Sequence, residues 1–209
     1  MCKTIICFGD SLTYGYCADY GTDYVSLLKK QVKIDFPKAD IVIKNKGENG
    51  ETSREGLKRL ENDVLSYNPD MIIMLFGSND SAFSEYQHRG IEEFSFNYDR
   101  IISAVKSKGS IDLILMTPPP VIEDHDMPFI ENAVLNKYCD VIKEKATANG
   151  LTLIDINKAF LEADNGNINR FMQWDGTHIS TEGYKLFFDA VYSTIKNRIA
   201  KLIDNGLND

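Results

Sequence analysis

The sequence has few cysteines, an excess of negative over positive charge and no long apolar run. No C-x-x-C pair occurs, so we expect reduced thiols rather than a disulfide framework. The 31 acidic residues outnumber the 23 basic ones and give a formal net charge of -8, which argues against nucleic acid and anionic lipid as partners. No apolar run approaches the length that crosses a bilayer, so we expect no membrane span. The four cysteines are Cys2, Cys7, Cys17 and Cys139.

Several signals for targeting and cofactor binding are also missing. The N-terminus enters an apolar run at once, without the basic and apolar regions of a secretory signal, so we expect a cytoplasmic protein. Neither G-x-G-x-x-G after the first apolar run nor a Walker-type G-K-[ST] occurs, which indicates no nucleotide cofactor. The stretch Glu123-Asp124-His125-Asp126 lacks the spacing of a strong metal site, and we interpret it as a solvated acidic loop. We therefore predict no metal and no other cofactor.

The patterning predicts one domain over residues 1–209, with a frayed polar tail at 203–209. Short apolar runs at 4–8, 41–44, 71–76, 111–116 and 151–155 read as strands, and stretches of helical period separate them. This alternation is typical of an α/β fold. We predict a three-layer α/β/α sandwich with a five-stranded parallel sheet in the flavodoxin-like order 2-1-3-4-5. The last helix should run to about residue 202, and Asp23, Thr52 with Glu55, and Ser180 are the predicted N-terminal caps.

Polar motifs follow the predicted strands. Gly9-Asp10-Ser11 comes after the first, the segment 45–50 after the second, Gly77-Ser78-Asn79-Asp80 after the third and Thr117-Pro118-Pro119-Pro120 after the fourth. The region after the fifth strand leads to Asp175-Gly176-Thr177-His178. Because the carboxyl ends of parallel strands share one edge of a sheet, we expect these motifs to surround a single crevice.

Four of these blocks, taken in order, resemble the SGNH hydrolases, also called GDSL-type esterases and lipases. The marker residues are Ser11 in Gly9-Asp10-Ser11-Leu12, Gly50 in Gly47-Glu48-Asn49-Gly50, Asn79 in Gly77-Ser78-Asn79-Asp80, and His178 in Asp175-Gly176-Thr177-His178. The resemblance covers nearly the whole chain. It implies the SGNH hydrolase fold and a serine esterase that acts on a small-molecule ester without a cofactor.

The chemistry assigns a role to each residue. A serine hydroxyl needs a neighbouring base to attack a carbonyl, and histidine suits that role near neutral pH, so Ser11 is the predicted nucleophile and His178 the base. Asp175, three residues before the histidine, would orient it and stabilise the imidazolium. The oxyanion hole would consist of the backbone amides of Ser11 and Gly50 and the side-chain amide of Asn79. We expect Asp10 only to shape the turn.

The leading hypothesis is an esterase that cleaves small or medium acyl groups, including acetyl, through an acyl-enzyme. A lysophospholipase or acyl thioesterase of the same family is the first alternative, and a flavodoxin-like binding module without enzymatic activity is the second. The oligomeric state stays open. We expect about half of the aromatic residues in these loops to wall the acyl pocket. They are Tyr14, Tyr16, Phe83, Tyr86, Phe129, Phe171 and Trp174.

Overall fold

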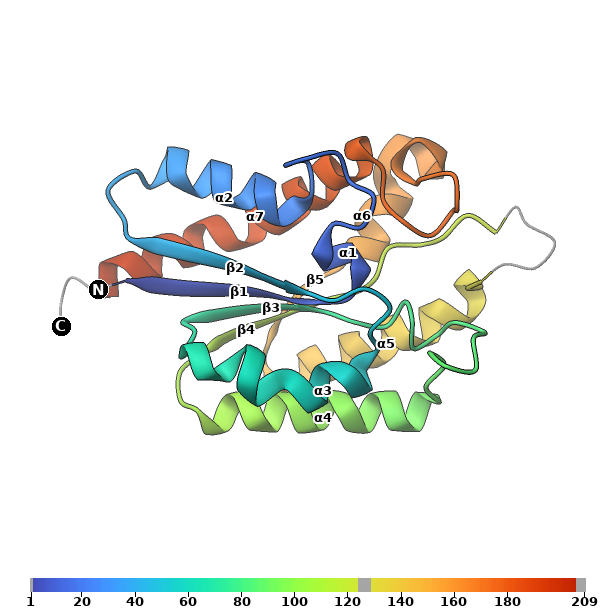
Figure 1. The fold of residues 1–209 in the computed structure, drawn as a ribbon, viewed down its shortest axis with the longest axis horizontal. Helices are drawn as coiled ribbons and strands as arrows, with labels where there is room; N and C mark the ends of the chain where they lie inside the picture. The colour runs from blue at the N-terminus through green and yellow to red at the C-terminus, as the bar shows by residue number, and fades with distance from the viewer. Residues whose placement is uncertain (1, 124–128, 206–209) are drawn as a thin grey trace.

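A computed structural model of the chain describes residues 2–123 and 129–205. Five strands pair in parallel in the order β2-β1-β3-β4-β5, which confirms the predicted topology (Figure 1). The predicted strands lie within a residue or two of the observed ones, except that the second continues three residues further, to Gly47. The strands are β1 (Lys3–Gly9), β2 (Ile41–Gly47), β3 (Met71–Leu75), β4 (Asp112–Met116) and β5 (Thr152–Ile154).

Helices cover both faces of the sheet, as the three-layer prediction requires (Figure 1). On one face, α2 (Tyr24–Asp35), α6 (Ile156–Glu162) and α7 (Thr181–Asn205) pack on a core that includes Ile5 and Cys7 of β1. On the other, α3 (Ser53–Asp63), α4 (Ile91–Ser107) and α5 (Asn132–Asn149) pack on a core that includes Ile6 and Phe8. Successive side chains of a strand point to opposite faces, so a short apolar run feeds both cores.

The predicted N-terminal caps are present. The Asp23 carboxylate accepts a hydrogen bond from the Ser26 amide at 2.9 Å, and the Ser180 hydroxyl accepts one from the Gly183 amide at 3.1 Å. Thr52 and Glu55 form the reciprocal capping box at the start of α3. These caps satisfy amide groups that the first turn of each helix leaves unpaired.

The predicted end of the last helix was wrong. α7 continues to Asn205 instead of ending near residue 202, because Leu202 and Ile203 pack against the core and stabilise another turn. The rest of the predicted tail, 206–209, lies outside the described residues, and so do 124–126 of the acidic stretch around His125.

The described residues contain no group of side chains able to hold a metal ion. None of the helices in this part of the chain is both long and apolar enough to cross a bilayer.

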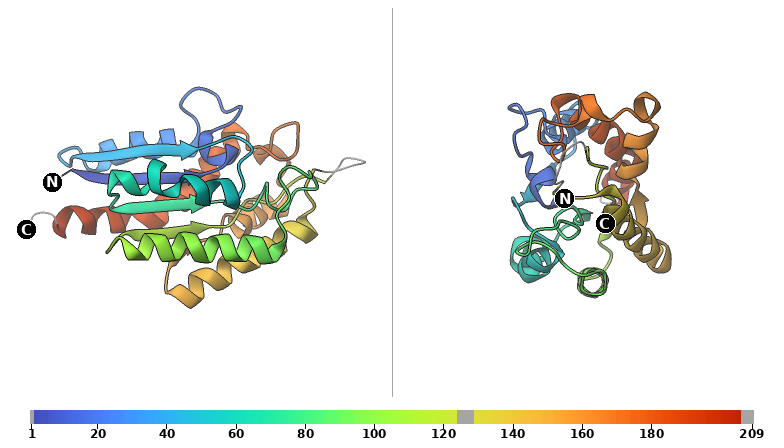
Figure 2. Two further views of the ribbon diagram at one scale, coloured as in Figure 1. Left: turned by 60° about the horizontal axis from the view of Figure 1, so that its bottom comes forward. Right: turned by 90° about the vertical axis from the view of Figure 1, so that its right-hand side faces the viewer.

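The topology gathers the loops that follow the strands at one end of the molecule. In the left view of Figure 2 the start of β1 and the end of α7 lie at one end of the sheet, and the loops after the carboxyl ends of the strands lie at the opposite end. The short helix α1 (Ser11–Tyr14) begins there, two residues beyond the end of β1. The turns η2 (Ala163–Gly166) and η3 (Asn169–Phe171) lead from α6 toward Asp175 and His178.

Candidate active site

Ser11 is the first residue of α1 and is presented by a sharp turn at the end of β1. Asp10 caps this helix, because its carboxylate accepts a hydrogen bond from the Leu12 amide at 2.9 Å. The turn packs tightly against the end of β2: a Cβ atom on Gly47 would lie 2.1 Å from the Tyr14 amide nitrogen. Only glycine allows this approach. The close packing fixes where the serine hydroxyl points.

The side chains of Ser11, His178 and Asp175 form a continuous hydrogen-bonded chain. The Nε2 atom of His178 lies 3.1 Å from the Ser11 hydroxyl oxygen, and its Nδ1 atom lies 2.6 Å from the Asp175 carboxylate. The second carboxylate oxygen accepts hydrogen bonds from the amides of Thr177 and His178, at 3.0 and 2.9 Å. This is the geometry that a serine nucleophile, a histidine base and an orienting carboxylate require.

The environment of Asp175 keeps this carboxylate ionised. Partial burial opposes ionisation, but the hydrogen bonds from the amide and imidazole of His178 and from the Thr177 amide outweigh it and lower the pKa of Asp175. The ring of Tyr16 packs on the imidazole, with the ring centres 4.6 Å apart. An ionised carboxylate on Nδ1 favours the tautomer whose Nε2 can accept a proton from serine.

The three predicted oxyanion donors face the same cavity as this hydrogen-bonded chain. Ser11, Gly50 and Asn79 line it together with Asp175 and His178. No described residue accepts a hydrogen bond from the backbone amide of Ser11 or Gly50. The Asn79 side-chain nitrogen donates to the Glu51 carbonyl at 2.8 Å, which uses one of its two hydrogens. The arrangement therefore offers N–H groups to a negative charge that develops beside Ser11.

One residue of the cavity was missed by the sequence analysis. The side-chain nitrogen of Gln87 lies 3.1 Å from the Gly50 carbonyl oxygen and 3.3 Å from the Asn79 side-chain oxygen. Gln87 stands in the long loop between β3 and α4, where no motif or periodicity distinguishes it. No sequence signal available from a single chain could have found it.

The cavity has a volume of about 470 Å³, and fewer aromatic residues wall it than predicted. Of the seven candidates, Tyr16 and Phe129 line it together with Leu12. Phe171 is buried in the core and packs on Phe160, and Trp174 is 90% exposed. The prediction failed because an aromatic residue in a loop can equally fill the core or face solvent.

Asp10 and Asp80 are buried carboxyl groups outside the hydrogen-bonded chain, next in sequence to Ser11 and Asn79, which line the cavity. Burial raises the pKa of Asp10 to about 7, and the charge of Asp80 raises it as well. Burial likewise raises the pKa of Asp80 to about 7, although the side chain and amide of Ser53 donate hydrogen bonds to it. One oxygen of Asp10 has no hydrogen-bond partner among the described residues. Asp10 therefore caps α1, as expected, in an environment that disfavours its charge.

This environment predicts a pH-dependent stability. A carboxyl group whose pKa is higher in the folded than in the unfolded chain stabilises the fold while protonated, and this stabilisation is lost as the pH rises through about 7. In Asp10→Asn the side-chain oxygen can still accept from the Leu12 amide and cap α1, but the side chain no longer takes up or releases a proton. The melting temperature of the variant minus that of the wild type should rise by a few degrees between about pH 5 and pH 8. Asp140→Asn, at an exposed position of α5, controls for the lost charge. A difference that stays constant or falls would contradict this interpretation.

Comparison with known proteins identifies the family. The model of the GDSL-like Lipase/Acylhydrolase family matches residues 7–186. A GDSL esterase/lipase of Arabidopsis thaliana is 27% identical over 223 residues, covering 94% of this chain and 87% of the relative. An acetylxylan esterase of Geobacillus stearothermophilus is 26% identical over 201 residues, covering 88% of this chain and 90% of the relative. The solved structure of a lipase/acylhydrolase from Enterococcus faecalis superimposes with a TM-score of 0.80 at 28% identity, covering 94% of this chain and 96% of that one. The chain therefore belongs to the GDSL-like lipase/acylhydrolase family, whose members are hydrolases that act on ester bonds.

Proposed function

We propose that the protein is a serine esterase in which Ser11 is the nucleophile, His178 the general base and Asp175 the orienting carboxylate. The observation that carries the proposal is the unbroken hydrogen-bonded chain, 3.1 Å from the Ser11 hydroxyl to the imidazole and 2.6 Å from the imidazole to the Asp175 carboxylate. Family membership favours this enzyme over a flavin-binding module. The single-domain organisation and the cytoplasmic location stay predictions.

The proposed reaction runs in two halves. The Ser11 oxygen attacks the ester carbonyl while His178 Nε2 takes the hydroxyl proton, and the tetrahedral intermediate places its negative oxygen against the amides of Ser11, Gly50 and Asn79. The intermediate then collapses: the bond to the alcohol breaks, and His178 returns the proton to the departing alkoxide. Water attacks the acyl-serine with His178 again as base, which releases the carboxylic acid and restores the Ser11 hydroxyl.

The cavity supports a short or medium acyl group. Its volume of about 470 Å³ is at the small end of ligand pockets, and it is shared between the acyl group, the alcohol and the reacting centre. Leu12, Tyr16 and Phe129 supply apolar surface, while Asn49 and Thr177 add polar edges. One relative is named an acetylxylan esterase, and an acetyl ester as substrate agrees with a small acyl group.

A chain-length series tests this substrate class. We expect kcat/KM for p-nitrophenyl acetate or butyrate to exceed that for the dodecanoate by about tenfold or more, because an acyl chain too long for the cavity displaces the ester carbonyl from its position beside Ser11. Acetylated sugars and an acyl thioester complete the panel. A maximum at the long-chain esters, or a preference for the thioester, would instead favour the lysophospholipase or thioesterase alternative.

A further inference from the structure

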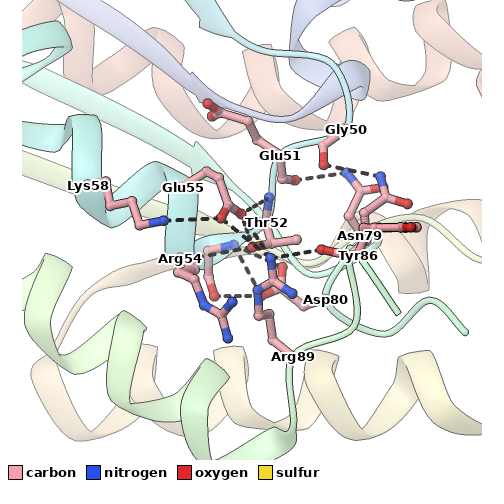
Figure 3. A network of polar contacts seen from close by, with 12 residues as sticks. Gly50, Glu51, Thr52, Arg54, Glu55, Lys58, Asn79, Asp80, Tyr86 and Arg89 are labelled. Atoms are coloured by element: carbon pink, nitrogen blue, oxygen red, sulfur yellow. Dashed lines mark hydrogen bonds and ion pairs between the residues drawn. The ribbon is translucent and has the colours of Figure 1, made fainter. Parts of the chain in front are cut away.

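The predicted oxyanion donors Gly50 and Asn79 lie in two different loops, and hydrogen bonds between side chains and backbone connect these two segments. Gly50 lies between β2 and α3, and Asn79 lies between β3 and α4. The Asn79 side-chain nitrogen donates to the carbonyl of Glu51, the residue after Gly50, at 2.8 Å (Figure 3). The amide of Ser53, the first residue of α3, donates to the Asp80 carboxylate at 3.1 Å. The positions of the two donors are therefore mutually dependent.

Gln87 contacts both donor residues with one amide group. Its side-chain nitrogen donates to the Gly50 carbonyl oxygen at 3.1 Å and to the Asn79 side-chain oxygen at 3.3 Å. The approach to Gly50 is close: a Cβ on Gly50, whose φ is +75°, would lie 3.3 Å from the Gln87 side-chain nitrogen. An amide nitrogen carries two hydrogens, so one side chain can serve both acceptors.

This contact settles which way the Asn79 amide faces. Its oxygen accepts from Gln87 and its nitrogen donates to Glu51, so a flip of the amide would set nitrogen against nitrogen and oxygen against oxygen. With this orientation, one N–H of Asn79 is used and the other is available to the cavity. The hydrogen bond to the Gly50 carbonyl similarly restricts rotation about the left-handed backbone of that residue.

The backbone on either side of Gln87 is held by a buried arginine. Arg89, 6% exposed, donates from its guanidinium to the carbonyl of Tyr86 at 3.0 Å (Figure 3). It also donates to the carbonyl of His88 at 2.8 Å, and these two residues flank Gln87. The same guanidinium pairs with Glu55, the capping residue of α3, at 3.4 Å. Gln87 is therefore presented to the oxyanion donors by a fixed segment of chain, although it stands in a loop.

We propose that Gln87 is a positioning residue of the oxyanion hole, which aligns the donors of Gly50 and Asn79 without contacting the reacting atoms. The inference rests on the proposed esterase function. Loss of a donor itself costs about 100- to 1000-fold in kcat, and misalignment of donors that remain present should cost less.

The test compares Gln87→Met and Gln87→Glu with the wild type on p-nitrophenyl acetate. Methionine keeps the length of the side chain and cannot donate, so we expect kcat to fall by about 10- to 100-fold with KM changed by less than about threefold. Glutamate should cost more, because its carboxylate repels the Asn79 oxygen and favours the flipped amide. Gln31→Met is the matched control: Gln31 donates to Asp35 on α2, remote from the cavity, and its variant should keep wild-type kcat.

A double-mutant cycle separates positioning from a general structural effect. If Gln87 acts largely through Asn79, the loss caused by Gln87→Met should shrink several-fold in an Asn79→Ala background. Wild-type kcat in both Gln87 variants, or an undiminished loss in that background, would overturn the proposal. An inactive wild type, or a Ser11→Ala variant that keeps its activity, would instead overturn the proposed function itself.

Discussion

Ser11→Ala should reduce ester turnover by a factor of about 10⁴ to 10⁶ while leaving the fold intact. Alanine removes the oxygen that forms the acyl-enzyme, and the residual rate depends on the oxyanion donors and substrate binding alone. Initial rates on p-nitrophenyl acetate measure the loss, and the melting temperature checks the fold. The substitution removes a single oxygen atom from a residue that lines the cavity, so it leaves little new empty volume.

Ser78 provides the matched control, because it is another serine that lines the cavity. Ser78→Ala should stay within about tenfold of the wild-type rate, since the ring nitrogens of His178 contact the Ser11 hydroxyl and the Asp175 carboxylate and not the Ser78 hydroxyl. A Ser11→Ala variant that retained more than about one per cent of wild-type turnover would exclude Ser11 as the nucleophile.

Asp175→Asn should reduce kcat by about 10⁴-fold, the second largest effect we expect. The amide oxygen of asparagine can still accept from the amides of Thr177 and His178, so the turn should survive. What is lost is the negative charge beside Nδ1, which sets the tautomer and stabilises the imidazolium that forms during attack. Steady-state kinetics and a melting curve report the two effects separately.

Asp155 is a suitable control for this substitution. Its carboxylate also accepts from a backbone amide, that of Lys158 at 3.1 Å, and its side chain is 22% exposed, compared with 24% for Asp175. It lies outside the residues that line the cavity. Asp155→Asn should therefore retain nearly all activity, and an equal loss in both variants would show that the effect of Asp175→Asn is not specific to the histidine.

The sequence predicted the sheet well because its three central strands, β1, β3 and β4, are buried along most of their length. Every residue of β3 is buried, so the strand reads as an uninterrupted apolar run between turn residues. The edge strand β2 was predicted too short, because Asn45 to Gly47 continue the pairing with β1 through backbone hydrogen bonds and carry no apolar signal. A buried strand requires apolar side chains and can therefore be recognised in the sequence, whereas backbone hydrogen bonds at an edge strand do not require any particular side chain.

The same distinction applies to the site. Ser11, Gly50 and Asn79 could be placed together because each stands in a short motif after a strand, and Asp175 and His178 because their motif lies in the region that follows the fifth strand. Gln87 could not, since its importance comes from side-chain contacts with Gly50, 37 residues away, and with Asn79, and no local motif or period marks these contacts. The walls of the cavity were equally hard to predict, because the orientation of a loop side chain depends on packing that no local pattern encodes.

Active-site labelling is the most direct test of Ser11 as the nucleophile. The protein is treated with a fluorophosphonate, digested and analysed by peptide mass spectrometry, with and without an excess of competing ester. We expect one adduct per chain, on the Ser11 hydroxyl. The competing ester should suppress this adduct, and the Asp175→Asn variant should form it far more slowly. An adduct confined to another residue, or esterase activity that survives treatment without any adduct at Ser11, would contradict this role of Ser11.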